Sequence, residues 1–384
     1  MAKKKEIFAV YFPSWHPDRH YEKWYGKGFC EWELLKTTEP LFAGHQQPLK
    51  PLLGYFDESD PKVMAQQIDL AADNGITGFM FDWYWYRSEE FLERPLNEAF
   101  LNAPNRNRLK FFLMWANHNW GIWPALDNGL RGMNGNENQA SCEPFLKITH
   151  SEKDLQEVMH YSCEKYFKCE NYWKIGGKPV YSFYNCNMLF QFIPPRDVLR
   201  IINEVAQAHG FPGIYTLMNI GCCNDNEYFC GWGRIPKMRD AGFDAVFAYN
   251  SGLRSNYAEV VAPDTPTIDF SYNMTNQRHC WKMIAEQGLP FVPSITLGGD
   301  VSPRWSRELT YPWDFEKMGY YPITVNNTPE RIGQLLKEAL AMETEAVIIN
   351  AWNEWSEGMY LIPDTFSGTS LLDKIKEVTD LYNQ

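Results

Sequence analysis

From Ile348 to Gly358 the sequence reads IINAWNEWSEG, an apolar run that leads directly into two carboxylates bracketed by tryptophans. In a (β/α)8 barrel the catalytic groups follow the strands, so this position is typical of an active site. Two acids three residues apart can face the same side if the segment turns helically, and tryptophan neighbours would raise the pKa of at least one. We therefore predict Glu354 and Glu357 as catalytic carboxylates. The alternative, a helix start whose acids favour the helix dipole, leaves the tryptophans and Asn353 without a role.

Short apolar runs followed by amphipathic helical patterns recur about eight times along the chain, which predicts βα units and a parallel sheet. The predicted strands are residues 7–12, 78–83, 111–115, 179–184, 214–218, 245–248, 291–295 and 346–350. The predicted helices are residues 61–74, 151–167, 195–209, 275–287, 328–342 and 368–382. Gly75 is a stop signal for the first of these helices, and Thr328-Pro329 is a start signal for the fifth.

The fold class that this alternation predicts is α/β, a single (β/α)8 TIM barrel over residues 1–384 with long βα loops. A doubly wound sheet also alternates, but it would need a GxGxxG or GxxxxGK[ST] phosphate loop, and the sequence has neither. The stretches after the strands are long at residues 14–54, 117–142 and 298–327, which predicts an extended cleft on the catalytic face. No linker, charge block or fixed-period repeat marks a domain boundary.

Composition narrows the class of function. Aromatic residues make up 16% of the chain, and exposed Trp and Tyr are stacking platforms for sugars, although a large aromatic core is the alternative. A net charge of −12 argues against a nucleic-acid partner. The nine cysteines are scattered without CxxC spacing, which indicates reduced thiols. We therefore predict a carbohydrate substrate and neither a metal nor a cofactor, and the oligomeric state stays open.

The first residues are Lys-rich and no long apolar segment follows them, so we expect no signal peptide, no membrane span and a cytoplasmic location. A chain from which a signal had been trimmed would read the same.

Other catalytic patterns are missing from the sequence: there is no GxSxG elbow, no HExxH and no Cys–His protease signature. Cys222, Cys223 and Cys230 lack a convincing fourth ligand for zinc. No Asp-x-Asp pair, the usual handle of many glycosyltransferases, is found.

Polar and aromatic side chains also follow the other predicted strands. In the run from Phe79 to Tyr86, period-2 burial places Phe79, Phe81 and Trp83 on one side and leaves Asp82 to line the mouth of the barrel. A wholly buried aromatic strand is the alternative. The predicted substrate-binding residues are Tyr11, Trp32, Asp82, Trp83, Tyr84, Trp115, Asn117, His118, Tyr249, Asp300, Arg304, Trp352, Asn353 and Trp355.

The Asn353 to Gly358 segment resembles the WbsX-like proteins, a group related to glycoside hydrolase family 99. The resemblance covers nearly the whole chain and includes residues 9–13 (AVYFP), 81–85 (FDWYW), 177–180 (GKPV) and 300–304. It implies a (β/α)8 barrel and, in the hydrolase branch, retaining endo-action on α-mannosides without a metal. The WbsX name implies surface-polysaccharide gene clusters and a glycosyltransferase.

The resemblance also implies roles for the two glutamates. Glu354 would act as base on the sugar 2-hydroxyl, whose oxygen attacks the anomeric carbon to give a 1,2-anhydro sugar. Glu357 would protonate the leaving oxygen and later activate water. The residues by themselves equally suit a conventional nucleophile and acid/base pair. Ser356 departs from the His that is typical of the mannosidase branch, so mannoside specificity does not carry over.

Three hypotheses follow. The first is a retaining glycoside hydrolase that acts on a complex polysaccharide or glycan, a class that includes α-mannosides. The second is a glycosyltransferase in surface-polysaccharide biosynthesis, which binding of a nucleotide-linked or lipid-linked sugar would favour. The third is a carbohydrate-binding protein that keeps the barrel without catalysis, because fold does not dictate function.

Overall fold

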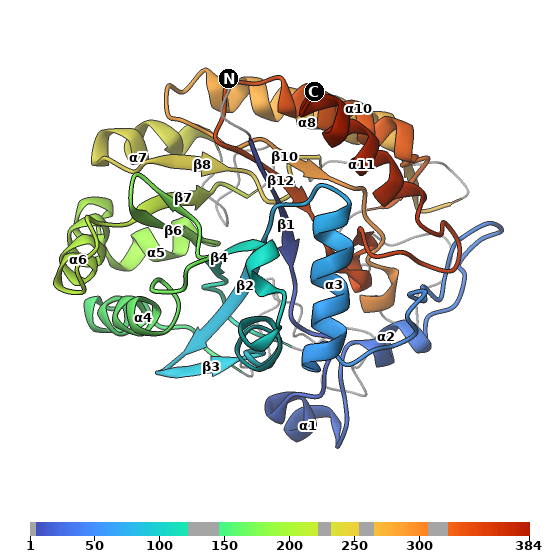
Figure 1. Ribbon diagram of the computed structural model, residues 1–384, viewed down its shortest axis with the longest axis horizontal. Coiled ribbons are helices and arrows are strands. Elements are labelled where there is room, and N and C mark those ends of the chain that lie inside the picture. The colour runs from blue at the N-terminus through green and yellow to red at the C-terminus, as the bar shows by residue number, and fades with distance from the viewer. Residues whose placement is uncertain (1–4, 122–145, 222–231, 253–264, 306–321) are drawn as a thin grey trace.

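The fold is a barrel of parallel strands surrounded by helices (Figure 1). A computed structural model describes residues 5–121, 146–221, 232–252, 265–305 and 322–384. Eight strands of the main sheet follow the order β10-β12-β1-β2-β4-β6-β7-β8. A parallel bridge between Val246 of β8 and Phe291, just before β10, connects the two ends of this order. The sheet is therefore nearly closed, and the predicted (β/α)8 barrel is confirmed.

Each predicted strand corresponds to one barrel strand. Their bounds are β1 (Glu6–Tyr11), β2 (Gly78–Tyr86), β4 (Lys110–Trp115), β6 (Lys178–Phe183), β7 (Tyr215–Asn219), β8 (Ala245–Phe247), β10 (Ser294–Thr296) and β12 (Ala346–Asn350). Strand β2 continues to Tyr86 because it pairs with the short antiparallel β3 (Glu89–Phe91), and β10 begins three residues later than the sequence predicts. The other short strands are β5 (Lys174–Ile175), β9 (Thr267–Asp269), β11 (Ile323–Val325), β13 (Asn353–Glu354) and β14 (Met359–Tyr360).

The six predicted helices are also present, and local capping explains most of their bounds. They are α3 (Pro61–Asp73), α4 (Glu152–Lys165), α6 (Pro195–Ala208), α8 (Phe270–Ala285), α10 (Pro329–Leu340) and α11 (Ser370–Tyr382). Helix α8 begins earlier than the sequence predicts, because the side chain of Asp269 accepts from Ser271 N at 2.8 Å and caps the helix there. The shorter helices are α1 (Arg19–Tyr25), α2 (Trp32–Lys36), α5 (Cys186–Phe192) and α7 (Ile235–Ala241).

All nine residues of β2 are buried, as the alternative of a wholly buried strand expects, but its two faces have different surroundings. Asp82 pairs in register with Met114 of β4, and Trp83 pairs with Trp115. Trp83 faces the helix layer, where its ring stacks on that of Tyr161 from α4. Successive side chains of a strand point to opposite faces, so Asp82 points into the barrel.

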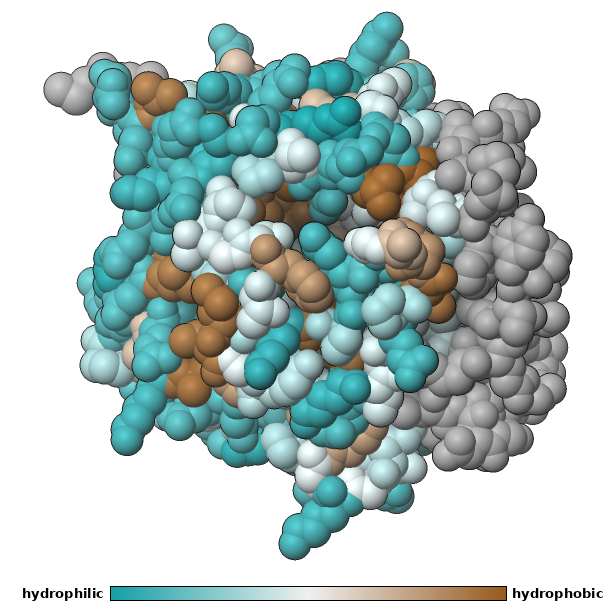
Figure 2. Space-filling model, turned by 90° about the vertical axis from the view of Figure 1, so that its right-hand side faces the viewer, coloured by the Kyte–Doolittle hydropathy of each residue, from teal (hydrophilic) through white to brown (hydrophobic). Residues whose placement is uncertain are grey.

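The face of the molecule in Figure 2 is mostly hydrophilic where it is coloured. Figure 2 shows a face on which apolar groups are scattered among hydrophilic residues. The exposed large apolar side chains among the described residues are Leu52, Leu53, Phe192, Phe366, Leu381 and Tyr382. No helix in the described part of the chain is both long and apolar enough to span a bilayer.

Candidate active site

A buried arginine joins three carboxylates at the carboxyl ends of the strands. Arg304 Nη2 lies 3.3 Å from Glu31 Oε2 and 3.4 Å from Glu354 Oε2. Its Nη1 forms an ion pair with Glu357 Oε1. The arginine side chain is only 3% exposed, and its guanidinium carbon lies 5.6 Å from the centroid of the Phe12 ring. The structure thus brings together the two predicted catalytic glutamates and the predicted Arg304.

The segment after β12 is folded so that both glutamates reach this cluster. Asn353 fixes its start, because its side chain accepts from Phe12 N and donates to Phe12 O, both at 2.8 Å. The 3-10 turn η7 (Trp355–Glu357) follows and ends at Gly358 with φ 65°. Glu357 O accepts from Asp300 N at 2.7 Å. A Cβ on Gly358 would lie 2.7 Å from Asp300 Cβ, so glycine is required for this close approach.

The environment of Glu354 favours a bound proton. Burial raises the pKa of Glu354 well above its usual range, the neighbouring charge of Glu357 raises it further, and Arg304 opposes both. The charges of Asp82 and Glu31 also raise it. A raised pKa favours the protonated carboxyl that a general acid needs and makes the ionised carboxylate a stronger base.

Asp82 is another buried carboxyl at the mouth of the barrel. Burial raises its pKa well above the usual range, the hydrogen bond from Tyr249 lowers it, and the charge of Glu357 raises it. Tyr249 OH donates to Asp82 Oδ2 at 3.2 Å, whereas Asp82 Oδ1 has no hydrogen-bond partner among the described residues. An unpaired buried oxygen is costly, so a ligand hydroxyl would complete its hydrogen bonding.

Aromatic rings from four barrel strands continue from Asp82 around the mouth. The ring of Tyr84 lies 6.1 Å from that of His118, and His118 lies 5.3 Å from Tyr184. Tyr184 lies 5.4 Å from Tyr249. Burial lowers the pKa of His118, so it is a neutral hydrogen-bonding group at neutral pH. The predicted residues Asp82, Tyr84, His118 and Tyr249 therefore form one wall.

Other predicted residues bind the loops to the barrel. Tyr11 OH donates to Glu58 Oε2 at 2.8 Å, and Asn353 Nδ2 is 3.3 Å from the same oxygen. Asn117 donates to Asn185 O at 3.0 Å and accepts from Asn185 N at 2.7 Å. The substrate-binding roles of Tyr11, Asn117 and Asn353 stay predictions.

Asp300 holds the long loop that follows β1. His45 Nε2 lies 2.9 Å from Asp300 Oδ2, and Gln47 donates to the same oxygen at 2.7 Å. Burial raises the pKa of Asp300, but the hydrogen bond and charge of His45 outweigh this and hold the pKa below its usual range. Asp300 reaches Glu357 through its backbone N–H alone, so its predicted contact with substrate remains open.

The predicted tryptophans pack against protein. They are Trp32, Trp83, Trp115, Trp352 and Trp355, and each is at most 3% exposed. Trp352 donates to Gln67 of α3 at 2.9 Å, and Trp355 stacks on Tyr360 at 4.0 Å. These contacts fit the large aromatic core that the composition also allowed, and a sugar-stacking role for these rings stays a prediction.

Three residues of the candidate site lie outside the predicted set of catalytic and substrate-binding residues. Glu31 and Tyr184 contribute as described above, and Ser356 Oγ donates to Glu31 Oε2 at 2.5 Å. The serine lies between the two glutamates, so the motif itself points to it. Glu31 lies within a long loop, and its sequence position alone does not show that it faces Arg304.

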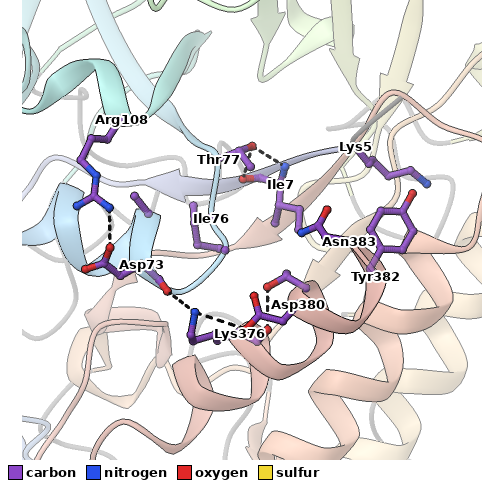
Figure 3. A pocket seen from close by; sticks show the side chains of 13 residues that line it. Lys5, Ile7, Asp73, Ile76, Thr77, Arg108, Lys376, Asp380, Tyr382 and Asn383 are labelled. Atoms are coloured by element: carbon purple, nitrogen blue, oxygen red, sulfur yellow. Dashed lines mark hydrogen bonds and ion pairs between the residues drawn. The ribbon is translucent and has the colours of Figure 1, made fainter. Parts of the chain in front are cut away.

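One other cavity can be compared with this site. A pocket of about 260 Å³ lies at the opposite end of β1 (Figure 3), where barrels are typically built for stability. Its charged groups pair with each other, since Arg108 lies 2.5 Å from Asp73 and Lys376 lies 3.5 Å from Asp380.

In the described residues no group of three or more His, Cys, Asp or Glu could hold a metal ion. Cys142, Cys222, Cys223 and Cys230 lie outside these residues, as do parts of the predicted loops 117–142 and 298–327.

Replacing Asp82 by Asn should increase the relative stability of the folded protein at high pH and decrease its activity. Its raised pKa means that the folded state binds the proton more tightly than the unfolded state, so stability is lost as pH rises through the folded pKa. Asn cannot ionise, so the thermal stability of the variant relative to the wild type should be greater at pH 8 than at pH 5. Turnover should fall about tenfold or more, because Asn has only one acceptor oxygen, which Tyr249 occupies, and its NH2 group cannot accept from a ligand hydroxyl at the position of Oδ1. A variant that is less stable at pH 8 than at pH 5, relative to the wild type, would contradict this.

Comparison with known proteins adds a family and a fold. The Glycosyltransferase WbsX family model matches residues 7–375. The uncharacterized protein WxcX of Xanthomonas campestris pv. campestris is 28% identical over 380 residues, covering 97% of this chain and 49% of that protein. The chain thus spans about half the length of the curated relatives it matches.

Solved structures with the same architecture are more distant in sequence. A GH99 endo-alpha-mannosidase from Bacteroides thetaiotaomicron has a TM-score of 0.55 and 13% identity, with 98% of this chain and 97% of that chain covered. A glycoside hydrolase-like protein has a TM-score of 0.58 and 15% identity, with 98% and 94% covered. At this identity the similarity establishes the barrel.

Proposed function

The chain belongs to the Glycosyltransferase WbsX family, and we propose that it is an enzyme that acts on glycans, namely a retaining glycoside hydrolase. The observation that carries the proposal is the pair of glutamates on one buried arginine, Glu354 and Glu357 on Arg304, at the carboxyl ends of barrel strands. Two carboxyl groups held near one position are the machinery that glycosidic bond cleavage uses. The barrel shared with the GH99 endo-alpha-mannosidase supports this choice of reaction.

The two glutamates have different environments, which supports different roles. Glu354 is buried, and this burial raises its pKa, which favours the protonated form and makes the ionised form a stronger base. Glu357 is ion-paired with Arg304, and its side chain is 13% exposed. Where two neighbouring carboxyl groups have different environments, one commonly acts as the acid and the other as its ionised partner.

Two assignments of roles remain, and they differ in where the proton starts. In the first, Glu354 protonates the leaving oxygen and Glu357 is the nucleophile or stabilises the developing positive charge. In the second, which the family resemblance implies, Glu354 takes the proton of the 2-hydroxyl and Glu357 protonates the leaving oxygen. Aryl glycosides with acidic leaving groups need little protonation, so the variant that keeps first-step activity on them identifies the acid.

A glycosyltransferase is the second candidate, and the family's own description favours it. A transferase would use the same carboxyls to activate an acceptor hydroxyl, with a nucleotide-linked or lipid-linked sugar as donor. Among the described residues, three carboxyl groups face Arg304, and such an excess of acidic groups disfavours a diphosphate at the same position. The hydrolase is therefore our first choice.

The experiment is incubation of the purified protein with a panel of α-linked oligosaccharides, followed by NMR of the anomeric protons. New reducing ends of retained configuration are expected. Transfer from nucleotide-linked or lipid-linked sugars, with no hydrolysis across the panel, would replace the hydrolase by the transferase. Affinity for sugars with no product from either class would indicate a binding protein.

A further inference from the structure

Glu31 is a wholly buried carboxylate behind Arg304 that the proposed mechanism leaves without a role. It precedes helix α2 and its side chain is 0% exposed. Oε1 lies 3.0 Å from Ser14 Oγ and 3.4 Å from Tyr21 OH. Oε2 accepts from Ser356 Oγ at 2.5 Å and lies 3.3 Å from Arg304 Nη2. A buried carboxylate needs such donors, and here they come from three separate loops.

These contacts connect the two loops that carry the proposed machinery. Arg304 belongs to the 3-10 turn η6 (Ser302–Arg304) after β10, and Ser356 belongs to η7 after β12. One oxygen of Glu31 contacts both. The nitrogen Nη2 is in turn divided between Glu31 and Glu354, so the position of the guanidinium relative to Glu354 depends on the contact with Glu31.

We propose that Glu31 is a positioning residue: it holds Arg304 and the Ser356 turn so that the guanidinium is shared between Glu354 and Glu357. The inference rests on the proposed function of these two glutamates. Glu31 is enclosed by protein and acts through Arg304. It withdraws part of the arginine's positive charge from Glu354, because the same nitrogen, Nη2, faces both carboxylates.

The proton on Glu354 reports this arrangement directly. In the described part of the chain, the charged and titratable groups that face Glu354 are Glu31 before α2, Asp82 and Tyr84 on β2, Tyr249 after β8, Arg304 on η6 and Glu357 on η7. Among these, the charge of Glu31 raises the pKa of Glu354 and that of Arg304 lowers it. In a Glu31→Gln variant one negative charge is lost and Nη2 is freed for Glu354, so both changes lower the pKa of Glu354.

The test is difference infrared spectroscopy of the protonated carboxyl stretch against pH, with Glu354→Gln identifying the Glu354 band. In Glu31→Gln the midpoint of this band should fall by about one pH unit or more. Glu33→Gln is the matched control, because Glu33 lies two residues away on α2 with a half-exposed side chain paired to Lys36. Its midpoint should equal that of the wild type. An unchanged midpoint in a folded Glu31→Gln protein overturns the proposal.

A second variant keeps the charge and shortens the reach. Glu31→Asp fits the same space but cannot contact Arg304 and Ser356 together, so kcat should fall at least about tenfold with little change in KM. The midpoint should move less than in Glu31→Gln. Wild-type kcat together with an unmoved midpoint in Glu31→Asp also overturns the proposal, even where the Gln variant fails to fold. Because the infrared midpoint needs no substrate, it decides the role of Glu31 separately from any failure to find glycosidase activity.

Discussion

Glu357→Gln should abolish nearly all turnover of a glycan substrate while the protein folds normally. Glutamine keeps the size of the side chain and can still accept from Arg304, but it can neither transfer a proton nor attack a sugar carbon. Loss of a positioned acid or base typically costs about 10²–10⁴ in rate, and we expect about 10³ or more here. Glu354→Gln should have a loss of the same order, because the two carboxyls act on one bond and their effects are not additive.

The measurement is the release of reducing ends by each variant under single-turnover and steady-state conditions. Glu343→Gln is the control, since this glutamate is exposed on the loop before β12 at the opposite end of the strand. It should retain wild-type turnover. Substantial activity in either catalytic variant would exclude that residue from the chemistry. Sugar affinity that survives in the double variant, with no product from the wild type, would favour the binding protein.

Arg304→Met should strongly destabilise the folded protein, and more so as pH rises. Removing one partner of a buried ion pair typically costs about 3–5 kcal/mol, because the remaining charge is left uncompensated. Here the loss would leave Glu31, Glu354 and Glu357 without their shared counter-charge. We therefore expect a loss of about 3 kcal/mol or more in the free energy of unfolding at pH 8.

The sign of the pH dependence follows from the carboxyls. Without Arg304, which lowers the pKa of Glu354, the folded-state pKa rises further above its unfolded value. A raised folded pKa contributes stability that is present at low pH and lost as pH rises through it. The destabilisation should thus be smaller at pH 5 than at pH 8, as measured by denaturant unfolding at both values.

Two other variants make this result specific. Arg331→Met removes a partly exposed arginine that lies 3.1 Å from Asp269, and it should change the free energy of unfolding by less than about 0.5 kcal/mol. Arg304→Lys keeps the charge without the fork, so its loss should be intermediate. A loss under about 1 kcal/mol in Arg304→Met, or one independent of pH, would mean that the three carboxyls do not depend on Arg304.

The sequence by itself determined the barrel and the position of its two glutamates. Strand and helix signals are local: apolar runs, caps such as Thr328-Pro329, and a stop such as Gly75 depend on neighbours a few residues away. Alternation along β2 likewise fixed the inward direction of Asp82. The predicted start of α8 at Thr275 is too late, since Asp269 caps the helix and the helix begins at Phe270.

Only the tertiary structure decided which groups meet around the glutamates. Glu31 is separated from Arg304 by 273 residues and from Ser356 by 325. Three loops from different strands bring these side chains together, and no local pattern encodes how long loops cross a barrel. The tertiary structure also showed that Trp352 and Trp355 are buried, because loop packing, and not residue type, determines whether an aromatic ring faces a ligand or the core.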